Sequence, residues 1–325
     1  MKAIRTVATQ IRSIRSAGDG VLQLELADPD EWELPPFVAG NHIDLHLPNG
    51  LVRSYSLCGS PAEATRYHVA VKREHAGRGG SIAVHELRVG DPLPVSLPRG
   101  TFTLSAEARE HVFIAGGIGI TPFVAMAAEL THSAAREDAS GAFDPRFVLH
   151  VLHRGSRPLE ALCAALLPAE SVVYHRSGEG QQRVDLACLI GAFVPGRHVY
   201  CCGPTALMDA VVAATRDWPA DHVHIEHFIP PERPVDADAK PYRVSLSLSK
   251  KTIDVLPNAS LLEALRDHDV HVDAACEGGI CGACRVRWLD GQPIHHDRVL
   301  SDAERQREVI VCVSGCASPT LVLEL

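Results

Sequence analysis

Apolar and polar residues alternate over short stretches near the start of the chain, and Gly, Pro and Asn separate these stretches. Short alternating segments with frequent turn residues indicate an antiparallel barrel or sandwich of β-strands. One helix is expected within this region, at 80–88. The expected strands cover 21–28, 42–48, 52–57, 67–74 and 92–98.

A different pattern begins near residue 110, where apolar runs alternate with segments of helical spacing. Strands that alternate with helices indicate βαβ units and a parallel sheet. The expected helices cover 121–132, 158–167 and 204–215. The expected strands cover 111–117, 146–153, 172–177, 198–203 and 222–228.

The segment 229–241 contains four prolines and five charged residues, a composition typical of an exposed, semi-rigid linker. The remaining residues predict a small α+β unit, with a helix at 260–268. Its strands are expected at 243–249, 252–256, 309–314 and 320–325. The expected fold class is therefore multidomain: an antiparallel β-barrel over 1–106, an α/β parallel-sheet domain over 107–228, the linker, and an α+β domain over 242–325.

Composition narrows the possible functions. The chain has 325 residues and a formal charge of −9, and 46% of its residues are hydrophobic. A net acidic chain is a poor match for nucleic acid or an anionic membrane, because phosphates attract a basic face. The sequence has no transmembrane-length apolar run and no apolar signal segment at its start, so we expect a cytoplasmic protein. The 18 histidines are scattered, and we expect them to be polar surface residues.

Half of the ten cysteines lie in the last 50 residues. Cys276, Cys281 and Cys284 have the spacing C-x4-C-x2-C, and Cys312 follows after 27 residues. Plant-type [2Fe–2S] ferredoxins have this spacing, in which one loop wraps the cluster and a separate strand adds the fourth thiolate. Zinc is the alternative, but structural zinc sites usually contain two C-x2-C pairs and only one is present here. Cys316 is interpreted as an ordinary thiol.

The sequence of the last domain, placed after two other domains, resembles the phthalate dioxygenase reductase family. This family includes the reductase components of vanillate O-demethylase-type systems. The resemblance covers essentially the whole chain and implies a β-grasp ferredoxin domain at 242–325. Two further motifs test it: one for a flavin and one for a pyridine nucleotide.

The flavin motif is Arg53-Ser54-Tyr55-Ser56, on an expected strand. A flavin needs an aromatic wall, a hydroxyl near N5 and a cation for its phosphate, and Tyr55, Ser56 and Arg53 supply these in that order. The segment 77–81, GRGGS, opens an expected helix, where free N–H groups favour a phosphate. Without the resemblance, the first segment would be explained as a surface Arg–Tyr pair and the second as a plain turn. The resemblance implies FMN rather than FAD, with contacts from Gly79, Gly80, Ser81, Val71 and Lys72.

The nucleotide motif, AGGIGITP at 115–122, follows an expected strand and opens an expected helix. Its glycines permit a close approach of the backbone to a dinucleotide. The resemblance places Cys202 near the hydride-donating carbon of the nicotinamide and Glu226 on the nicotinamide side. It places Phe228 against the flavin. The alternatives are a buried structural role for Cys202 and a packing role for Phe228. The remaining nucleotide contacts that it implies are Gly116, Gly117, Gly119, Thr121, Pro122, Gly203 and Pro204.

The segment after the strand at 172–175 departs from the family pattern, since many members have an acidic residue there for the adenosine ribose. Here the residues are Arg176 and Ser177, a cation and a hydroxyl suited to a 2′-phosphate. Arg154 is a further candidate contact. Plain exposed arginines are the alternative, so NADH and NADPH both remain open.

The resemblance implies a reductase that passes electrons from NAD(P)H through FMN and a [2Fe–2S] cluster to a Rieske non-haem iron oxygenase acting on an aromatic compound. The expected catalytic residues are Ser56, Cys202 and Glu226, and a monomer is expected. Two alternatives are a reductase for another acceptor, such as a diiron monooxygenase or a haem enzyme, and a non-enzymatic flavin and iron–sulfur redox sensor.

Overall fold

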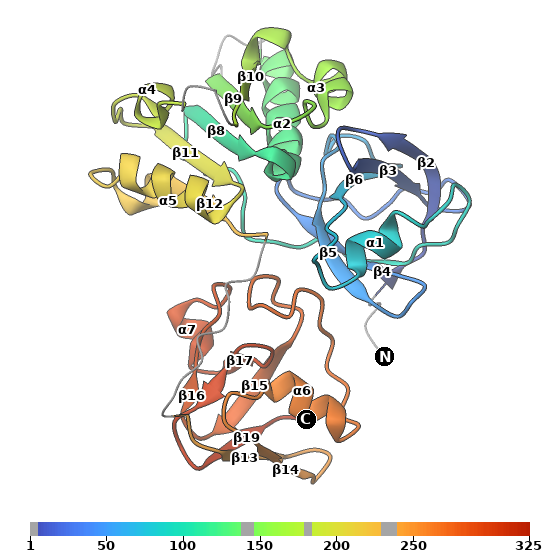
Figure 1. Ribbon diagram of the computed structural model, residues 1–325, viewed down its shortest axis with the longest axis vertical. Helices are drawn as coiled ribbons and strands as arrows, with labels where there is room; N and C mark the ends of the chain where they lie inside the picture. Colours follow the sequence, from blue (N-terminus) through green and yellow to red (C-terminus); the bar gives the residue numbers. More distant parts are fainter. Residues whose placement is uncertain (1–5, 138–145, 179–183, 229–238) are drawn as a thin grey trace. The chain divides into compact units, whose positions relative to one another are not determined.

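The computed structural model describes residues 6–137, 146–178, 184–228 and 239–325 (Figure 1). The chain forms two compact units, Met1–Phe228 and Ile229–Leu325. The boundary between them falls where the predicted linker begins, although most of that linker, 229–238, lies outside the described residues. In the described residues, no helix is long and apolar enough to cross a membrane.

The start of the first unit consists of two antiparallel sheets. The two sheets are connected by isolated bridges, Gln10 with Pro92 and Leu57 with Val69. The described strands therefore do not form one continuously hydrogen-bonded, closed barrel. Strand β7 is only two residues long because Pro92, Pro94 and Pro98 around it lack N–H donors. The sheets contain β1 (Thr6–Val7), β7 (Val95–Ser96), β4 (His42–His46) and β5 (Val52–Ser56) in one, and β2 (Gln10–Ser16), β3 (Val21–Ala27) and β6 (Tyr67–Lys72) in the other.

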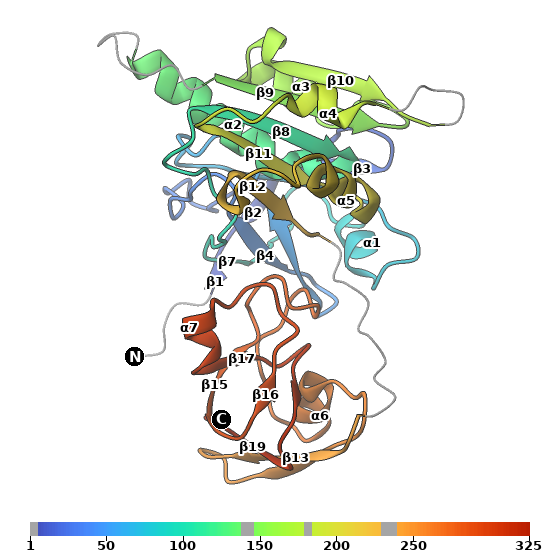
Figure 2. The same cartoon turned by 90° about the vertical axis from the view of Figure 1, so that its left-hand side faces the viewer.

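The rest of the first unit is a five-stranded parallel sheet, as predicted. Its spatial order is β10 (Val172–Arg176), β9 (Arg146–His153), β8 (Glu110–Gly116), β11 (Arg197–Cys202) and β12 (Val223–Glu226). Helices cover the sheet (Figures 1 and 2). They are α2 (Thr121–Glu137), α3 (Glu160–Leu166), α4 (Leu186–Ile190) and α5 (Thr205–Ala214), with 3-10 turns η1 (Gly117–Ile120), η2 (Ala169–Ser171) and η3 (Ala220–His222).

The two predicted N-terminal domains pack as one body, since a single apolar core runs through both. Leu24 of β3 and Phe123 of α2 belong to the same buried cluster. A reciprocal hydrogen-bond pair also joins them: the Ser156 N–H donates to the Asp19 carboxylate (2.8 Å), and the Asp19 N–H donates to Ser156 Oγ (2.6 Å). These bonds lower the pKa of Asp19.

The second unit contains a mixed five-stranded sheet in the order β14 (Thr252–Val255), β13 (Tyr242–Leu246), β19 (Thr320–Leu323), β15 (Arg285–Asp290) and β17 (Glu308–Ile310). Helix α6 (Leu261–Asp267) buries Leu261, Leu262 and Leu265 against it. A reciprocal capping box between Ser260 and Glu263 starts the helix. The remaining elements are β16 (Pro293–Ile294), α7 (Asp302–Arg305) and β18 (Gly315–Cys316).

The strand expected at 92–98 is reduced to β7, and three further predictions about local structure are wrong. The strand expected at 309–314 ends at Ile310, so Cys312 lies in a turn. The helix expected at 80–88 ends early, as α1 (Gly80–Val84). Several histidines are buried: His111 and His198 are each 2% exposed, and His198 Nδ1 lies 3.0 Å from His224 Nε2. Burial lowers the pKa of His111 and of His224 to about 4, so these rings are neutral at pH 7 and tolerate burial.

Candidate functional site

The four predicted cluster ligands lie together in the second unit. Cys276, Cys281 and Cys284 occupy the loop between α6 and β15, and Cys312 follows β17. The Cys276 thiol contacts those of Cys281 and Cys312, and Cys312 also contacts Cys284. All four are buried, whereas Cys316 is half-buried and bonds to Ser318.

The backbone of this loop directs N–H groups at the sulfurs. The Gly278 N–H donates to Cys276 Sγ (3.4 Å), and Gly279 N–H donates to Cys312. Gly279 has φ +73°, and a Cβ there would be 2.8 Å from Val313 Cγ2, so this position favours glycine. N–H donors around converging thiols suit a negatively charged iron–sulfur cluster.

The thiol contacts form a continuous series from Cys281 through Cys276 and Cys312 to Cys284. The hydrogen bond from Cys276 and burial both raise the pKa of Cys281, so cluster binding there releases a proton. No three His, Cys, Asp or Glu side chains in the described ranges are arranged to hold a single metal ion. The four buried sulfurs and their N–H donors fit a cluster with more than one iron.

The segment predicted as a flavin motif meets the glycine-rich turn. Arg53, on β5, donates from Nη2 to the Arg78 carbonyl (3.0 Å). A Cβ at Gly80 would lie 2.5 Å from Arg53 Cγ, so the arginine stem crosses the turn. Gly79 has φ +79° and directly precedes α1, and Ser81 Oγ accepts from the Glu74 N–H (3.0 Å).

The next residues of β5 are partly or fully buried. Burial raises the pKa of Tyr55 to about 12, so its hydroxyl stays neutral. Ser56 is buried. Ser54 Oγ donates to Asp44 (2.7 Å), and Asp44 also pairs with Arg99. Sequence reasoning missed this Asp44 clamp, because its three members come from different strands and a loop.

On the neighbouring strand β6, the two predicted flavin contacts differ. Val71 is buried, whereas Lys72 is exposed and its Nζ lies 3.1 Å from Glu74 Oε1. An ion pair with Glu74 satisfies the Lys72 charge without a ligand.

The two predicted nucleotide turns interlock at the carboxyl edge of the parallel sheet. They follow β8 and β11, the strands between which the chain order reverses, which is where open α/β sheets bind ligands. A Cβ at Gly119 would overlap the Cys202 carbonyl, and one at Gly203 would be 2.9 Å from Gly116 Cα. Gly117 has φ +57° and open space around it.

The first residues of α2 close this turn. Thr121 is buried, and its Oγ1 donates to the Ile118 carbonyl (3.2 Å). Pro122 is the second residue of the helix, where the absence of an N–H removes no helical hydrogen bond. Pro204 has a similar place directly before α5.

Glu226 and Cys202 lie side by side at this edge, paired in register on β12 and β11. Glu226 Oε2 is buried and has no hydrogen-bond partner. Burial raises the pKa of Glu226 to about 8 and, with Glu226 nearby, raises that of Cys202. Both groups are therefore largely neutral at pH 7. Phe228, two residues on, packs against the core of the first unit.

Two arginines lie at the same edge of the sheet. Arg154 follows β9, and Arg176 ends β10 in register with His153. Both are exposed, and neither has an ion-pair partner among the described residues. The Ser177 hydroxyl donates to the His153 carbonyl (3.2 Å), so only its acceptor side is open to a ligand.

The chain is similar to known proteins over most of its length. A family model described as a 2Fe-2S iron-sulfur cluster binding domain matches residues 245–318. The chain is 38% identical to the phthalate 4,5-dioxygenase oxygenase reductase subunit of Pseudomonas putida, over 94% of this chain and 93% of that protein. It is 40% identical to the heme-dependent oxidative N-demethylase beta subunit of Ectopseudomonas mendocina (strain ymp), over 89% and 90%.

A solved structure shares the fold of the whole chain. It is phthalate dioxygenase reductase, described as a modular structure for electron transfer from pyridine nucleotides to [2Fe–2S]. The two chains superpose with a TM-score of 0.72 at 37% identity, over 98% of each.

Proposed function

The chain belongs to the phthalate dioxygenase reductase family, and from this premise we propose that it is the NAD(P)H-dependent reductase component of an oxygenase system. Electrons pass from NAD(P)H through FMN and a [2Fe–2S] cluster to a Rieske non-haem iron oxygenase that acts on an aromatic compound. The observation that carries this proposal is the presence in one chain of two sites: the interlocked glycine turns at the sheet edge and the four converging thiols. The proposed domains keep the boundaries 1–106, 107–228 and 242–325.

FMN, when bound, supplies the conversion of a two-electron hydride donor into single electrons. We assign the flavin ring to the wall formed by Tyr55 and Val71, and its N5 edge to the Ser56 hydroxyl. The neutral Tyr55 hydroxyl adds no charge beside the ring. Arg53 and the turn Gly79–Ser81 bind the phosphate, because the arginine already lies across that turn.

The interlocked turns position the nucleotide. Gly117 leaves open space through which the backbone meets the dinucleotide. Cys202 and Glu226 border the nicotinamide, and the unpartnered Glu226 carboxyl hydrogen-bonds a polar group of the ligand, since an unsatisfied buried oxygen is costly. Supporting contacts to the nucleotide come from Gly116, Gly119, Thr121, Pro122, Gly203 and Pro204, and supporting contacts to the flavin come from Ser54, Lys72 and Phe228.

Arg154 and Arg176 determine the preference between nucleotides. Two exposed guanidinium groups without ion-pair partners in the described chain favour the extra phosphate of NADPH. We therefore infer that the protein accepts NADPH as well as NADH.

The partner is an oxygenase, and we propose that it is of the Rieske type and that the reductase itself is a monomer. A relative named as the beta subunit of a heme-dependent N-demethylase favours a haem enzyme as the second candidate acceptor. Reconstitution with each class of oxygenase, at equal NAD(P)H, distinguishes the two.

The experiment that tests the function starts from the purified holoprotein. It should be brown-yellow, contain FMN and iron, and reduce both ferricyanide and cytochrome c with NADH or NADPH. A folded preparation without flavin would overturn the proposal. Flavin and iron without steady nucleotide-dependent turnover would instead indicate a redox sensor.

A further inference from the structure

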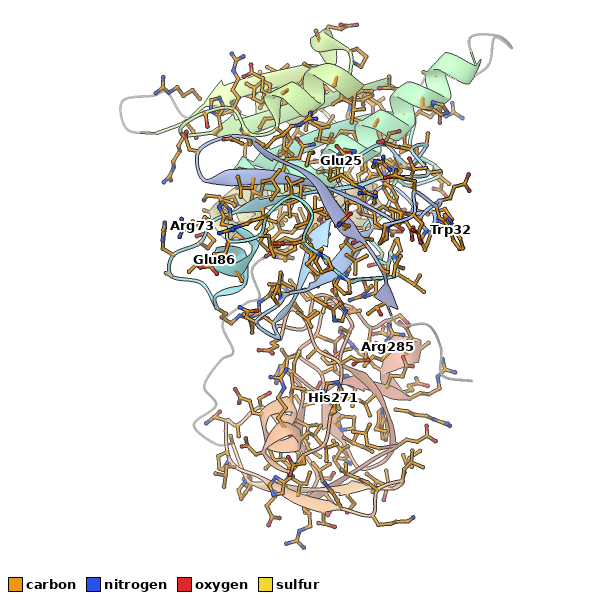
Figure 3. All side chains as sticks on the ribbon, turned by 90° about the vertical axis from the view of Figure 1, so that its right-hand side faces the viewer. Glu25, Trp32, Arg73, Glu86, His271 and Arg285 are labelled. Carbon is orange, nitrogen blue, oxygen red and sulfur yellow. The ribbon has the colours of Figure 1, made fainter. Side chains whose placement is uncertain are left out.

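Among the residues that the structure describes, the most exposed large apolar side chain is Trp32, with 73% of its surface accessible. It lies in the loop between β3 and β4, and Figure 3 shows it projecting from the edge of the first unit. The other two tryptophans, Trp218 and Trp288, are half-buried. Trp218 packs against Phe193, and Trp288 donates to the Arg305 carbonyl. Trp32 has no such contact in the described chain.

The loop that presents Trp32 is firmly held on both sides. Glu31, directly before it, has φ +62°, a left-handed conformation that is costly for a residue with a side chain. The Glu31 carboxylate bonds Arg12 and Arg66, each at 2.7 Å. These two ion pairs hold the strained turn that directs Trp32 into solvent.

After Trp32, the chain returns to the core. Leu34 and Phe37 are buried, and the Leu34 N–H donates to the Ala64 carbonyl (2.8 Å). The Tyr67 hydroxyl bonds the Pro35 carbonyl. An apolar group held outward on a fixed backbone loses little entropy on binding, so it is well suited to anchor a protein partner.

The surroundings of Trp32 are acidic. Asp30 and Glu33 flank it, both are exposed, and neither forms an ion pair within the described part of the chain. A cleft of about 160 Å³ next to it is lined by Pro35, Pro36 and Phe37 together with Glu33 and Glu63. Glu63 Oε2 lies 3.2 Å from His68 Nε2, whereas Glu33 has no ion-pair partner in the described chain. A cleft lined by apolar and acidic residues fits the stem and charged head of a Lys or Arg side chain.

We propose that Trp32 and the acidic cleft beside it form a docking surface for a Lys/Arg-rich face of the oxygenase component. This inference rests on the proposed function, which requires an oxygenase partner. Trp32 inserts between basic side chains of the partner, and one of them enters the cleft toward Glu33 and Glu63. The Asp30 and Glu33 carboxylates, which have no ion-pair partner in the described chain, select a basic protein over an acidic one.

The test uses the full-length holoprotein with the photo-crosslinking residue p-benzoylphenylalanine at position 32, made in cells that contain its oxygenase. Val89, another exposed apolar residue of the first unit (61%), is the matched control position. Illumination should cross-link position 32, and not 89, to a Lys/Arg-rich segment of an oxygenase component. Cross-links from position 32 only to a second copy of this chain, or to no oxygenase, would overturn the proposal.

A kinetic measurement with the purified oxygenase identified in this way completes the test. Trp32→Ala and Glu33→Lys should each raise KM for the oxygenase by about tenfold. Val89→Ala and the exposed Asp217→Lys should leave it unchanged. Ferricyanide reduction should be normal in all four variants. Unchanged KM in Trp32→Ala and Glu33→Lys contradicts the docking surface, whereas lost ferricyanide reduction in the unsubstituted protein contradicts the proposed function instead.

Discussion

The cluster loop of the second unit and the sheet edge of the first unit depend on the sequence in different ways. Three of the four thiols lie within nine residues, so the ligand set is a local feature. The sheet edge combines Gly119, Cys202 and Glu226, which are far apart in the chain and meet only through strand register. A local site is lost by changing one ligand, whereas an assembled site is sensitive to any change that separates its strands.

The largest effect is expected from Cys281→Ser, which removes a buried thiol in contact with Cys276. The [2Fe–2S] signal in electron paramagnetic resonance and cytochrome c reduction should both be abolished. NAD(P)H-dependent ferricyanide reduction should persist, because the first unit is a separate compact body.

The matched control is Cys316→Ser, which alters a half-buried thiol bonded to Ser318. It should keep the cluster signal. Loss of the signal in this variant, or its retention in Cys281→Ser, would show that the ligand set is wrong.

The sheet edge should respond next most strongly to Gly119→Ala, because the added methyl group overlaps the Cys202 carbonyl. Separation of the two turns should raise KM for NAD(P)H by roughly tenfold to a hundredfold, with the iron content unchanged. Gly315→Ala, where the nearest atom would be 3.8 Å from the new Cβ, is the control. Normal nucleotide kinetics in Gly119→Ala would refute the interlocking of the turns.

Glu226→Gln should lower kcat/KM for NAD(P)H by about tenfold, the equivalent of one hydrogen bond. Burial raises the folded-state pKa of Glu226 to about 8, from an ordinary value of 4.5. The folded protein therefore binds more protons than the unfolded chain between these values, and stability falls as pH rises through that window. Thermal unfolding of Glu226→Gln should show a weaker loss of stability from pH 5 to pH 8, and parallel pH profiles would contradict the burial of this carboxyl.

The smallest effect is expected from Arg176→Asp at the exposed end of β10. The ratio of NADPH to NADH activity should fall severalfold to about tenfold, as a phosphate contact is replaced by repulsion. Steady-state rates with both nucleotides measure this. If the ratio does not move, Arg176 is a plain surface residue, and Arg154→Asp then becomes the remaining test of a phosphate contact.

Much of the fold could be predicted because hydrophobic periodicity reports burial directly. The run at 146–153 predicted β9 without error, and the parallel sheet followed from its alternation with helices. Hydrophobic periodicity predicted the wrong structure where hydrogen bonds, and not burial of apolar residues, determined the local conformation. The apolar segment 309–314 turns after Ile310, which brings Cys312 to the other thiols, and the buried His198 ring pairs with that of His224.

The candidate site was predictable only as a set of separate motifs. The spacing of the cysteines indicated their convergence, and the Arg53 motif and the turn at 77–81 do meet. The Asp44 clamp on Ser54 and the missing partner of Glu226 are consequences of strand pairing and burial. No local pattern in the sequence encodes them.

The central claim is that one chain carries both a nucleotide-reducible flavin and an iron–sulfur cluster. Its most direct test is an anaerobic titration of the holoprotein with NADH, followed by absorbance and by electron paramagnetic resonance. The account predicts that NADH bleaches the flavin and that the signal of a reduced [2Fe–2S] cluster then develops. Bleaching of the flavin with no reduced-cluster signal in iron-loaded protein, or no bleaching with either NADH or NADPH, would contradict it.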